Sequence, residues 1–479
     1  MQKIIIVLWI SCLLPAYLAA QSNSASIIKN VRIIDVENGS ISKKSAVKIS
    51  AGHIEKIGTF RDLKTPGAAV WNGKGRYLIP GLWDNHIHIE GENLVEDNLA
   101  LFQVYLAHGI TTVRDAASDL GEQVLKWRAD INEHKLVGPT IYTAGRKLEG
   151  INSIWKGDLE IADEEELEQM LIKLDGYRVD FVKITENTLE GPLFLKSVLA
   201  ARKRGYIVSG HVPIDLSIAD LAEAGFSAIE HASYVLRLGS DEEEMIRKLK
   251  AGELSKSQMD QAYFQQFDPF KAMERYRLLA ARQVAVCPTL IGGKQLAFLD
   301  EDDHKNDAFL KYLTARFVAN YQWRIDRMAG ETPEQRQIRK DKYQLISRQV
   351  PLMQEAGVLL LAGSDAAALN TYVYPAASLI EELGLFQQAG MSPLHVLQSA
   401  TMNGAKFLGK YEQVGSITEG KIADLLLLDQ NPLQDIQAVS SLSAVIKGGI
   451  LYDRKALDDM LQQAADKKAA LDRSRGDEK

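Results

Sequence analysis

Residues 80–89 read PGLWDNHIHI, a Pro-Gly turn followed by an apolar stretch with two histidines, His86 and His88, one residue apart. Side chains alternate faces along a β-strand, so both imidazoles are expected to enter the same space. Two neutral imidazoles side by side are natural ligands for a transition metal. Two unrelated histidines on a strand are the alternative, and the rest of the chain has to decide between these interpretations.

Eight short apolar runs recur between about residues 81 and 410, with helical stretches between them. They read GLWDNHIHI, GITTVRDAA, PTIYTAG, VDFVKIT, YIVSGHV, SAIEHAS, VAVCPTL and VLLLAGSD. Apolar strands that alternate with helices indicate a parallel sheet in an α/β protein. Eight such units favour a closed, TIM-like (β/α)8 barrel over an open doubly wound sheet, and we expect it to span residues 80–411. No GxGxxG or Walker-type stretch follows any run, which argues against nucleotide binding.

Short strands and turns flank the predicted barrel on both sides. Residues 26–79 alternate apolar and polar positions between Asn-Gly, Ala-Gly and Gly-Lys-Gly turns, and a similar pattern returns after residue 411. We therefore expect residues 21–79 and 412–455 to build one small β-sandwich domain from both ends of the chain. Residues 456–479 are highly charged and predict a helical tail.

Two long charged stretches interrupt the repeat of strands and helices. One precedes the seventh apolar run, and the other covers residues 300–348. Both are typical of solvated helices. An insertion at the carboxyl end of a barrel often covers an active site, and a peripheral helical decoration is the alternative interpretation.

The first 20 residues are typical of a secretory signal peptide. Lys3 precedes an apolar run over residues 4–14, and the small residues that follow end in a cleavage point after Ala20. The run is short for a membrane span, which needs about 20 apolar residues. We expect an exported protein, periplasmic or secreted, without stable membrane association after cleavage. A lipid anchor at Cys12 and an uncleaved anchor are the alternatives.

The bulk composition excludes some classes of partner. The chain has 479 residues and a formal charge of −7, and its 56 basic residues form no stripe, so nucleic-acid binding is not expected. Without the leader, Cys287 is the one remaining cysteine, which leaves no pair for an internal disulfide. A small-molecule substrate is the expected partner, and a homo-oligomer stays open.

Polar residues lie near the carboxyl ends of the predicted barrel strands, where barrel enzymes place their chemistry. They are His86, His88, Lys183, His211, His231 and Asp365. Each has a structural explanation by itself, such as a hydrogen-bonded core histidine or a helix cap. Their joint placement favours one shared site, because strand eight of a closed barrel lies beside strand one.

These motifs resemble the amidohydrolase superfamily, near its imidazolonepropionase-like and prolidase-like branch. LIPGLWDNHIH, GITTVRDAA, VDFVKIT, IEHAS and LLLAGSDA match the strand signatures of the family. MSPLHVLQSATMNGAKFLG and VGSITEGKIADLLLLDQNPL match its closing region, so the similarity covers nearly the whole chain after the leader.

The resemblance implies a role for each of the six residues. His86, His88 and Asp365 would hold a more buried divalent ion, and His211 and His231 a more exposed one. Lys183 would bridge the ions as a carbamate, and the ions would share a hydroxide of lowered pKa. Asp365 would act as general base and then as general acid. Zinc is the default ion, and manganese, cobalt and iron also suit such ligands.

The chain departs from the family at two places. Its fifth strand reads SGHVP in place of a double-histidine HAHG, and the loop IEGENLVED after His88 is acidic instead of glycine-rich. The substrate therefore does not transfer from a relative. Candidate substrate contacts are Arg114, Arg146, Tyr234 and Thr289, each at or just past a strand end, and an arginine would suit a carboxylate. Trp155 is expected to serve packing.

The resulting expectation is an exported hydrolase with two metal ions that cleaves an amide or peptide-like C–N bond, in a dipeptide or a cyclic amide. A metal-dependent esterase or lactonase would use the same site. A metal-free barrel that acts as a binding scaffold is the alternative outside enzymology, and the complete ligand set argues against it.

Overall fold

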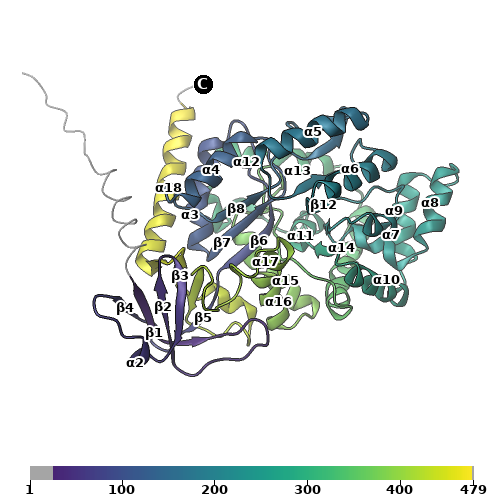
Figure 1. Ribbon diagram of the computed structural model, residues 1–479. Helices are drawn as coiled ribbons and strands as arrows, with labels where there is room; N and C mark the ends of the chain where they lie inside the picture. Colours follow the sequence, from purple (N-terminus) through teal and green to yellow (C-terminus); the bar gives the residue numbers. More distant parts are fainter. Residues whose placement is uncertain (1–24, 477–479) are drawn as a thin grey trace, which may run out of the picture.

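The computed structural model describes residues 25–476, so the predicted signal peptide lies outside the described residues. Strands from both ends of the chain share one eight-stranded sheet, drawn in purple and yellow-green at the base of Figure 1. Its order is β17-β16-β15-β5-β1-β2-β3, and β4 also pairs with β1. The strands are β1 (Ser26–Ile33), β2 (Ser45–Ser50), β3 (His53–Gly58), β4 (Ala69–Asn72), β5 (Tyr77–Pro80), β15 (Leu425–Leu428), β16 (Leu442–Lys447) and β17 (Ile450–Asp453).

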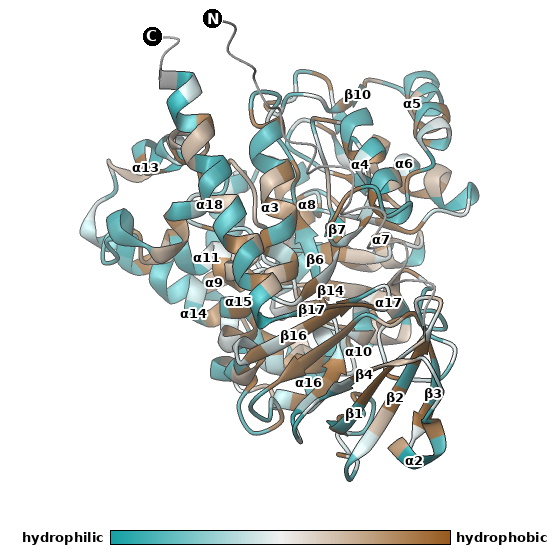
Figure 2. Ribbon diagram, turned by 90° about the vertical axis from the view of Figure 1, so that its left-hand side faces the viewer, coloured by the Kyte–Doolittle hydropathy of each residue, from teal (hydrophilic) through white to brown (hydrophobic). Residues whose placement is uncertain are grey.

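Strand β1 links the two halves of this terminal sheet. Its first residues pair with β2 and β4, and its last two pair with β5. The register shifts between Lys29 and Val31, where Asn30 adopts a φ of 58°. Such a bulge bends a strand and allows it to serve two neighbours in different directions. Figure 2 shows these strands largely in brown and the outer helices largely in teal.

Two parallel sheets form the centre of the molecule. One has three strands, β6 (Leu82–Ile87), β7 (Ile110–Asp115) and β8 (Thr140–Thr143). The other has the order β10-β9-β11-β12-β13-β14, with β9 (Leu148–Gly150), β10 (Leu159–Ile161), β11 (Val182–Ile184), β12 (Val208–Gly210), β13 (Ala228–Glu230) and β14 (Ala285–Cys287). Every residue of β6 and β7 is buried, as expected of parallel strands that are covered on both faces.

Hydrogen bonds connect the two parallel sheets at both of their seams. At one seam the N–H of Asp180 donates to Thr143 O. At the other, the eighth apolar run forms parallel bridges from Leu360 to Val286 and from Ala366 to Ile87. The structure therefore confirms seven of the eight predicted strands as regular strands, whereas the eighth run makes isolated bridges only.

Helices separate the strands, as the repeat predicted, and most lie outside the sheets in Figure 1. Those of the first half are α2 (Phe60–Leu63), α3 (Val95–Ala107), α4 (Glu122–Asn132), α5 (Glu164–Tyr177), α6 (Gly191–Lys203) and α7 (Ile218–Glu223). Helix α11 (Leu290–Ala297) lies between the two charged segments. After both segments come α15 (Ala377–Ala389), α16 (Pro393–Ser399), α17 (Met402–Phe407) and the 3-10 turn η4 (Ile436–Ser440).

Both charged stretches are helical, as predicted. The first contains η1 (Tyr234–Gly239), α8 (Glu242–Lys250), α9 (Lys256–Gln265) and α10 (Pro269–Ala281). The second contains η2 (His304–Asn306), η3 (Ala308–Tyr312), α12 (Ala315–Ala319), α13 (Gln322–Met328) and α14 (Pro333–Glu355). Helix α14 begins with a capping box between Thr332 and Gln335 and carries Pro333 in its first turn, which are strong helix-start signals.

The charged tail is a helix, α18 (Arg454–Gly476), that lies along α3 in both ribbon views. Leu457, Met460 and Ala464 are buried at this contact and explain why so polar a segment packs on the protein. No helix among residues 25–476 is both long and apolar enough to cross a membrane.

Candidate active site

The six residues singled out in the sequence lie at neighbouring strand ends. His86 is in β6 and Lys183 in β11, whereas His211 and His231 directly follow β12 and β13. Asp365 closes the eighth run, where its N–H donates to His86 O over 2.7 Å. Because parallel strands place their carboxyl ends at one edge, residues up to about 280 positions apart in the sequence meet here.

Each of the four histidines engages a neighbour through Nδ1. Nδ1 of His86 lies 2.7 Å from Glu230 Oε2, and Nδ1 of His88 lies 2.8 Å from Ala117 O. Nδ1 of His231 lies 2.8 Å from Thr289 Oγ1, whereas Nδ1 of His211 lies 2.9 Å from Glu186 Oε2 without the geometry of a hydrogen bond. At His86 and His88 the carboxylate or carbonyl fixes the proton on Nδ1 and leaves the lone pair on Nε2, which is how proteins orient metal-binding imidazoles.

The Nε2 atoms then converge with the carboxylate of Asp365. Nε2 of His86 and Nε2 of His88 are 3.3 Å apart, and each is 3.3 Å from Asp365 Oδ1. The Nε2 atoms of His211 and His231 are 3.2 Å apart. Ligand atoms held at about 2.0–2.1 Å around a tetrahedral zinc ion stand about 3.3 Å from each other. Both groups of side chains therefore fit a divalent metal ion.

Lys183 is suited to bind metal ions once its amine is converted to a carbamate. Its side chain is buried, and its Nζ has no hydrogen-bond partner among residues 25–476. Burial lowers the pKa of this amine to about 8. An unpaired buried ammonium is costly, whereas a neutral amine can react with carbon dioxide to form an anionic carbamate. The orphaned Nζ is thus consistent with a carbamate ligand.

Burial and neighbouring charges set the protonation of the ligands. Burial holds the pKa of His231 well below its usual range, so this imidazole is neutral. Burial by itself would raise the pKa of Asp365, but the adjacent His86 and His88 outweigh it and keep that pKa well below the ordinary value. A neutral imidazole and an ionised carboxylate are the forms that bind metal ions.

Three residues of the site hold a left-handed backbone conformation that is unusual for residues other than glycine. His231 has a φ of 71°, Asp365 of 60° and Thr289 of 48°. Such strain persists where the surrounding structure imposes it, and it clusters at active sites. The positive φ also ends the alternation of side chains, which explains why the neighbours Glu230 and His231 both reach the site.

Arg114, a predicted substrate contact, is engaged in the interior of the protein. Its guanidinium is fully buried and donates to Glu230 Oε1 over 2.8 Å and to Oε2 over 2.9 Å. Its Nε donates to Asn85 O, and it does not line either cavity described below. Arg114 therefore supports the carboxylate that orients His86.

The other three predicted substrate contacts also have protein partners. Arg146 donates to Gly157 O over 2.9 Å and lines neither cavity. The hydroxyl of Tyr234 donates to Glu186 over 2.5 Å, and its ring stacks on His211, so it supports that ligand. Thr289 does line a cavity, but its hydroxyl is engaged with His231.

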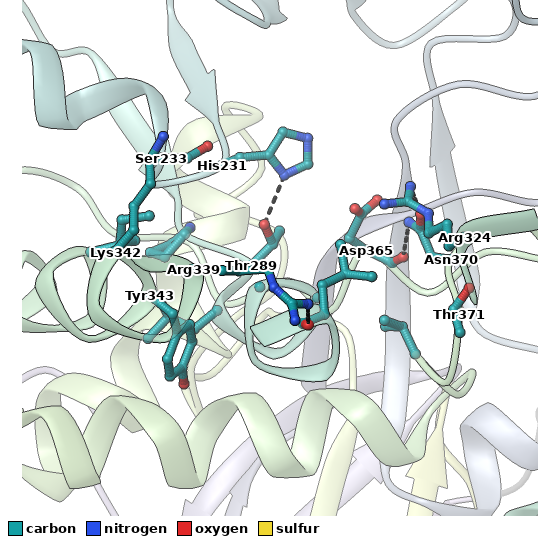
Figure 3. Close-up of a pocket in the computed structure, with 17 residues that line it drawn as sticks. His231, Ser233, Thr289, Arg324, Arg339, Lys342, Tyr343, Asp365, Asn370 and Thr371 are labelled. Atoms are coloured by element: carbon teal, nitrogen blue, oxygen red, sulfur yellow. Dashed lines mark hydrogen bonds between the residues drawn. The ribbon is translucent and has the colours of Figure 1, made fainter. Parts of the chain in front are cut away.

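Two cavities meet at the histidines and at Asp365. The smaller, shown in Figure 3, has a volume of 380 Å³ and continues toward α11 and α14. The larger, of 710 Å³, is lined by His88, Lys183, His211 and the loops after β6 and β9. Four residues line both cavities: His231, Arg324, Asp365 and Asn370. A substrate that spans the reacting centre can thus place one part on each side of it.

The second charged stretch supplies part of the cavity wall, so it is more than a peripheral decoration. Trp323 and Arg324 of α13 border the larger cavity. Trp155, expected to serve packing, also lines it and lies edge-on to Trp323 with ring centroids 5.9 Å apart. Sequence reasoning missed Glu186, Glu230, Trp323 and Arg324. A signal existed for Glu230, which directly precedes His231 at a strand end.

Parallel strands that carry four converging imidazoles, a carboxylate and an unpaired buried lysine define a metal-dependent hydrolase on an α/β scaffold. The profile of the Amidohydrolase family matches residues 77–451, and the chain belongs to this family. It is therefore a hydrolase that acts on carbon–nitrogen bonds, in a family that generally uses divalent metals. The resemblance inferred from the strand motifs is confirmed.

Similar proteins come from curated sequences and from solved structures. The chain is 24% identical over 435 residues to ochratoxinase from Aspergillus niger, a match that covers 78% of this chain and 75% of that protein. A bottromycin amidohydrolase structure superimposes with a TM-score of 0.72 at 19% identity and covers 95% of this chain and 93% of that one. A Xaa-Pro dipeptidase with bound methionine reaches a TM-score of 0.66 at 20% identity over 90% and 100% of the two chains.

Proposed function

We propose that the protein is an exported amidohydrolase that uses two divalent metal ions to hydrolyse an amide or peptide-like C–N bond in a small substrate. One observation carries the proposal. The three ligand atoms of His86, His88 and Asp365 form a triangle with 3.3 Å sides, and the Nε2 atoms of His211 and His231 form a second pair 3.2 Å apart. A shared cation makes such convergence of lone pairs favourable.

The proposal assigns the ligands as follows. His86, His88 and Asp365 would hold the more buried ion, because the His86 imidazole is fully enclosed. His211 and His231 would hold the second ion at the wall of the larger cavity. Lys183, as a carbamate, would bridge the two. Zinc suits these nitrogen and oxygen ligands, as do manganese, cobalt and iron. The seven regular strands at the predicted positions and the eighth apolar run would close into one eight-stranded barrel around this centre, beside a terminal β-sandwich.

When bound, the two ions would activate a water molecule and polarise the scissile carbonyl. A side chain of the protein then has to transfer a proton from the attacking water to the leaving amine. Oδ1 of Asp365 faces the two imidazoles, which leaves Oδ2 available to take a proton from the attacking water and to deliver it to the leaving amine. The backbone of Asp365 is held by bonds to His86 O and from Asn370 Nδ2, so the carboxylate needs little reorganisation during the reaction.

The cavities favour a small substrate. Their volumes of 380 and 710 Å³ are in the range of sites that enclose small molecules. The relatives named ochratoxinase and Xaa-Pro dipeptidase support an amide or dipeptide-like compound. The sequence of residues 1–20 supports export, since it has the charged start, apolar run and small-residue end of a cleavable leader.

Metal analysis combined with one variant tests the proposal. The purified protein should contain about two equivalents of divalent metal. Lys183→Ala should lower the metal content and abolish hydrolysis of amides in a library of dipeptides and N-acyl amino acids. The matched control is Lys173→Ala, since Lys173 is an exposed lysine of α5, and this change should have no effect. Metal-depleted protein should recover more activity when bicarbonate accompanies the metal.

Three results would contradict the proposal. Protein without tightly held metal would favour a binding scaffold. Full activity of Lys183→Ala together with indifference to bicarbonate would remove the carbamate. Hydrolysis of esters and lactones without any hydrolysis of amides would assign the same centre to a different bond.

A further inference from the structure

Arg324 is fixed against the loop that carries Asp365. Its Nε donates to Leu369 O over 3.2 Å, and its Nη2 donates to Asn370 Oδ1 over 2.6 Å. Asn370 in turn donates from Nδ2 to Asp365 O over 2.7 Å. Figure 3 shows Arg324, Asn370 and Asp365 beside each other at one end of the smaller cavity. The guanidinium of α13 is therefore held in a defined position next to the reacting centre.

This guanidinium forms no direct ion pair, although Asp365 and Glu90 attract it from a longer distance. Among residues 25–476 no carboxylate lies within ion-pairing distance of Arg324, and both of its acceptors are neutral oxygens. The other cations of the smaller cavity are paired, Arg339 with Glu331 over 2.9 Å and Lys342 with Asp260 over 2.7 Å. Arginine stays charged in proteins, and a largely desolvated charge without a partner is costly. The guanidinium of Arg324 is thus free to form an ion pair with an anionic group of a ligand where the cavities meet.

The position of Arg324 indicates which part of a ligand its guanidinium would bind. Arg324 is one of the four residues that line both cavities, together with Asp365 and His231 from the metal-binding group. We propose that Arg324 is the specificity-determining residue that binds a carboxylate of the substrate close to the scissile C–N bond. This inference rests on the proposed function, since it assigns the substrate class to the same site.

The geometry of the Arg324 guanidinium suits a carboxylate. Nε and Nη2 are occupied by Leu369 and Asn370, which fixes the plane of the fork and leaves the Nη1 protons for an anion. A carboxylate held by a positioned arginine forms short charge-assisted hydrogen bonds. The role that the sequence suggested for Arg114 or Arg146 therefore falls to an arginine of the inserted helix α13.

An apolar wall beside Arg324 defines the second half of the ligand. Trp323 donates from Nε1 to the same carbonyl, Leu369 O, over 2.9 Å, so both side chains are docked on one loop. Its indole lies edge-on to Trp155 across the larger cavity, and Ile154 next to Trp155 is 69% exposed. Indole rings favour planar or apolar groups. The expected substrate class is an amide with a carboxylate and an apolar or aromatic side chain.

A pair of probes that differ at one group, an anionic carboxylate or a neutral hydroxymethyl, tests the role of Arg324. N-acetyl-L-phenylalanine carries the carboxylate, and N-acetyl-L-phenylalaninol replaces it with a neutral hydroxymethyl group. Turnover and calorimetric binding of both are measured with the metal-loaded wild-type protein. Arg324→Gln should reduce kcat/KM or affinity for the acid by about 10- to 100-fold and change the values for the alcohol by less than about twofold. Arg324→Lys should restore part of the loss, because it keeps the charge without the fork.

The matched control is Arg327→Gln, since Arg327 is an exposed arginine on the same helix that lines neither cavity. It should leave both probes unaffected. Equal losses for acid and alcohol in Arg324→Gln would show a structural role and overturn the proposal. A wild-type protein that does not prefer the acid, or does not bind it, would also overturn it.

The two proposals fail in different ways. Binding of the acid that depends on Arg324, in a protein that hydrolyses no amide, would refute the proposed function and retain the carboxylate site. Hydrolysis of acid and alcohol with equal efficiency would retain the amidohydrolase function and refute the role of Arg324.

Discussion

The buried pair of Arg114 and Glu230 offers a quantitative test of how the metal ligands are supported. Both side chains are fully enclosed, and two parallel hydrogen bonds of 2.8 and 2.9 Å join them. Glu230 also orients His86, at 2.7 Å from Nδ1. Removing one partner leaves a buried charge without compensation, whereas removing both leaves none. The two changes should therefore be strongly non-additive.

The magnitude follows from the burial of the pair. Arg114→Met and Glu230→Gln should each lower the free energy of unfolding of the metal-free protein by about 3–5 kcal/mol. The double variant should lose about 1–3 kcal/mol, for the hydrogen bond at His86 and the changed packing. The sum of the single changes then exceeds the loss in the double variant by about 3 kcal/mol or more. Urea unfolding followed by tryptophan fluorescence measures all four proteins of the cycle.

An exposed ion pair serves as the control for this double-mutant cycle, and one outcome of the cycle would refute the coupling of Arg114 and Glu230. Arg247 and Glu244 form an exposed ion pair on α8, and Arg247→Met should leave the unfolding midpoint unchanged. Glu230→Gln should also weaken metal binding by about 10- to 100-fold, because it changes the partner of a ligating histidine. If the double variant loses the full sum of the two single losses, the pair is not coupled and the reasoning is refuted.

Three further predictions concern packing, pH and metal. Gly210→Ala should strongly destabilise the fold and reduce metal binding, because a Cβ there would stand 1.9 Å from Ile184 O between β11 and β12. Gly176→Ala, on the open face of α5, is the control and should be neutral or slightly stabilising. Thermal unfolding and metal content are measured for both variants. Burial raises the pKa of Glu382 to about 8. The folded protein therefore keeps a proton that the unfolded chain loses near pH 4.5. Because of this group, the free energy of unfolding falls as the pH rises between 4.5 and about 8. Glu382→Gln should reduce that slope by up to about 1.4 kcal/mol per pH unit in urea unfolding at a series of pH values, and an unchanged slope would contradict it. Chelation should lower the unfolding temperature, and metal at 100 times its Kd should restore about 2.7 kcal/mol; a temperature unaffected by chelation would argue against a metal site.

Local patterns in the sequence were sufficient to locate most strands and to identify the histidine pair. Strand alternation has a period of two and acts within a few residues, so His86 and His88 could be assigned to one space without knowledge of the fold. The eighth run shows where this reasoning stops. It was expected to form a regular strand, but Asp365 leaves the extended conformation with a φ of 60°, and the run makes isolated bridges only.

Side chains that depend on distant partners could not be assigned from the sequence. Arg114 lies within the second apolar run and was expected at the substrate, but its partner Glu230 lies 116 residues further along the chain. A pairing between residues so far apart is decided by which strand ends meet, and no local pattern encodes that. The partners of Tyr234 and Thr289 could not be assigned for the same reason, since Tyr234 donates to Glu186 and Thr289 contacts His231.

The sequence by itself determined most of the elements and which side chains are able to bind metal, because strand period, turn residues and ligand chemistry are local properties. Tertiary structure alone decided the surroundings of that centre. It placed Trp323 and Arg324 of the inserted helix α13 on the loop after Asp365, through bonds to Leu369 and Asn370. A polar helix has many surfaces on which it could pack, and only the complete set of long-range contacts selects the one that brings a charge into the active site.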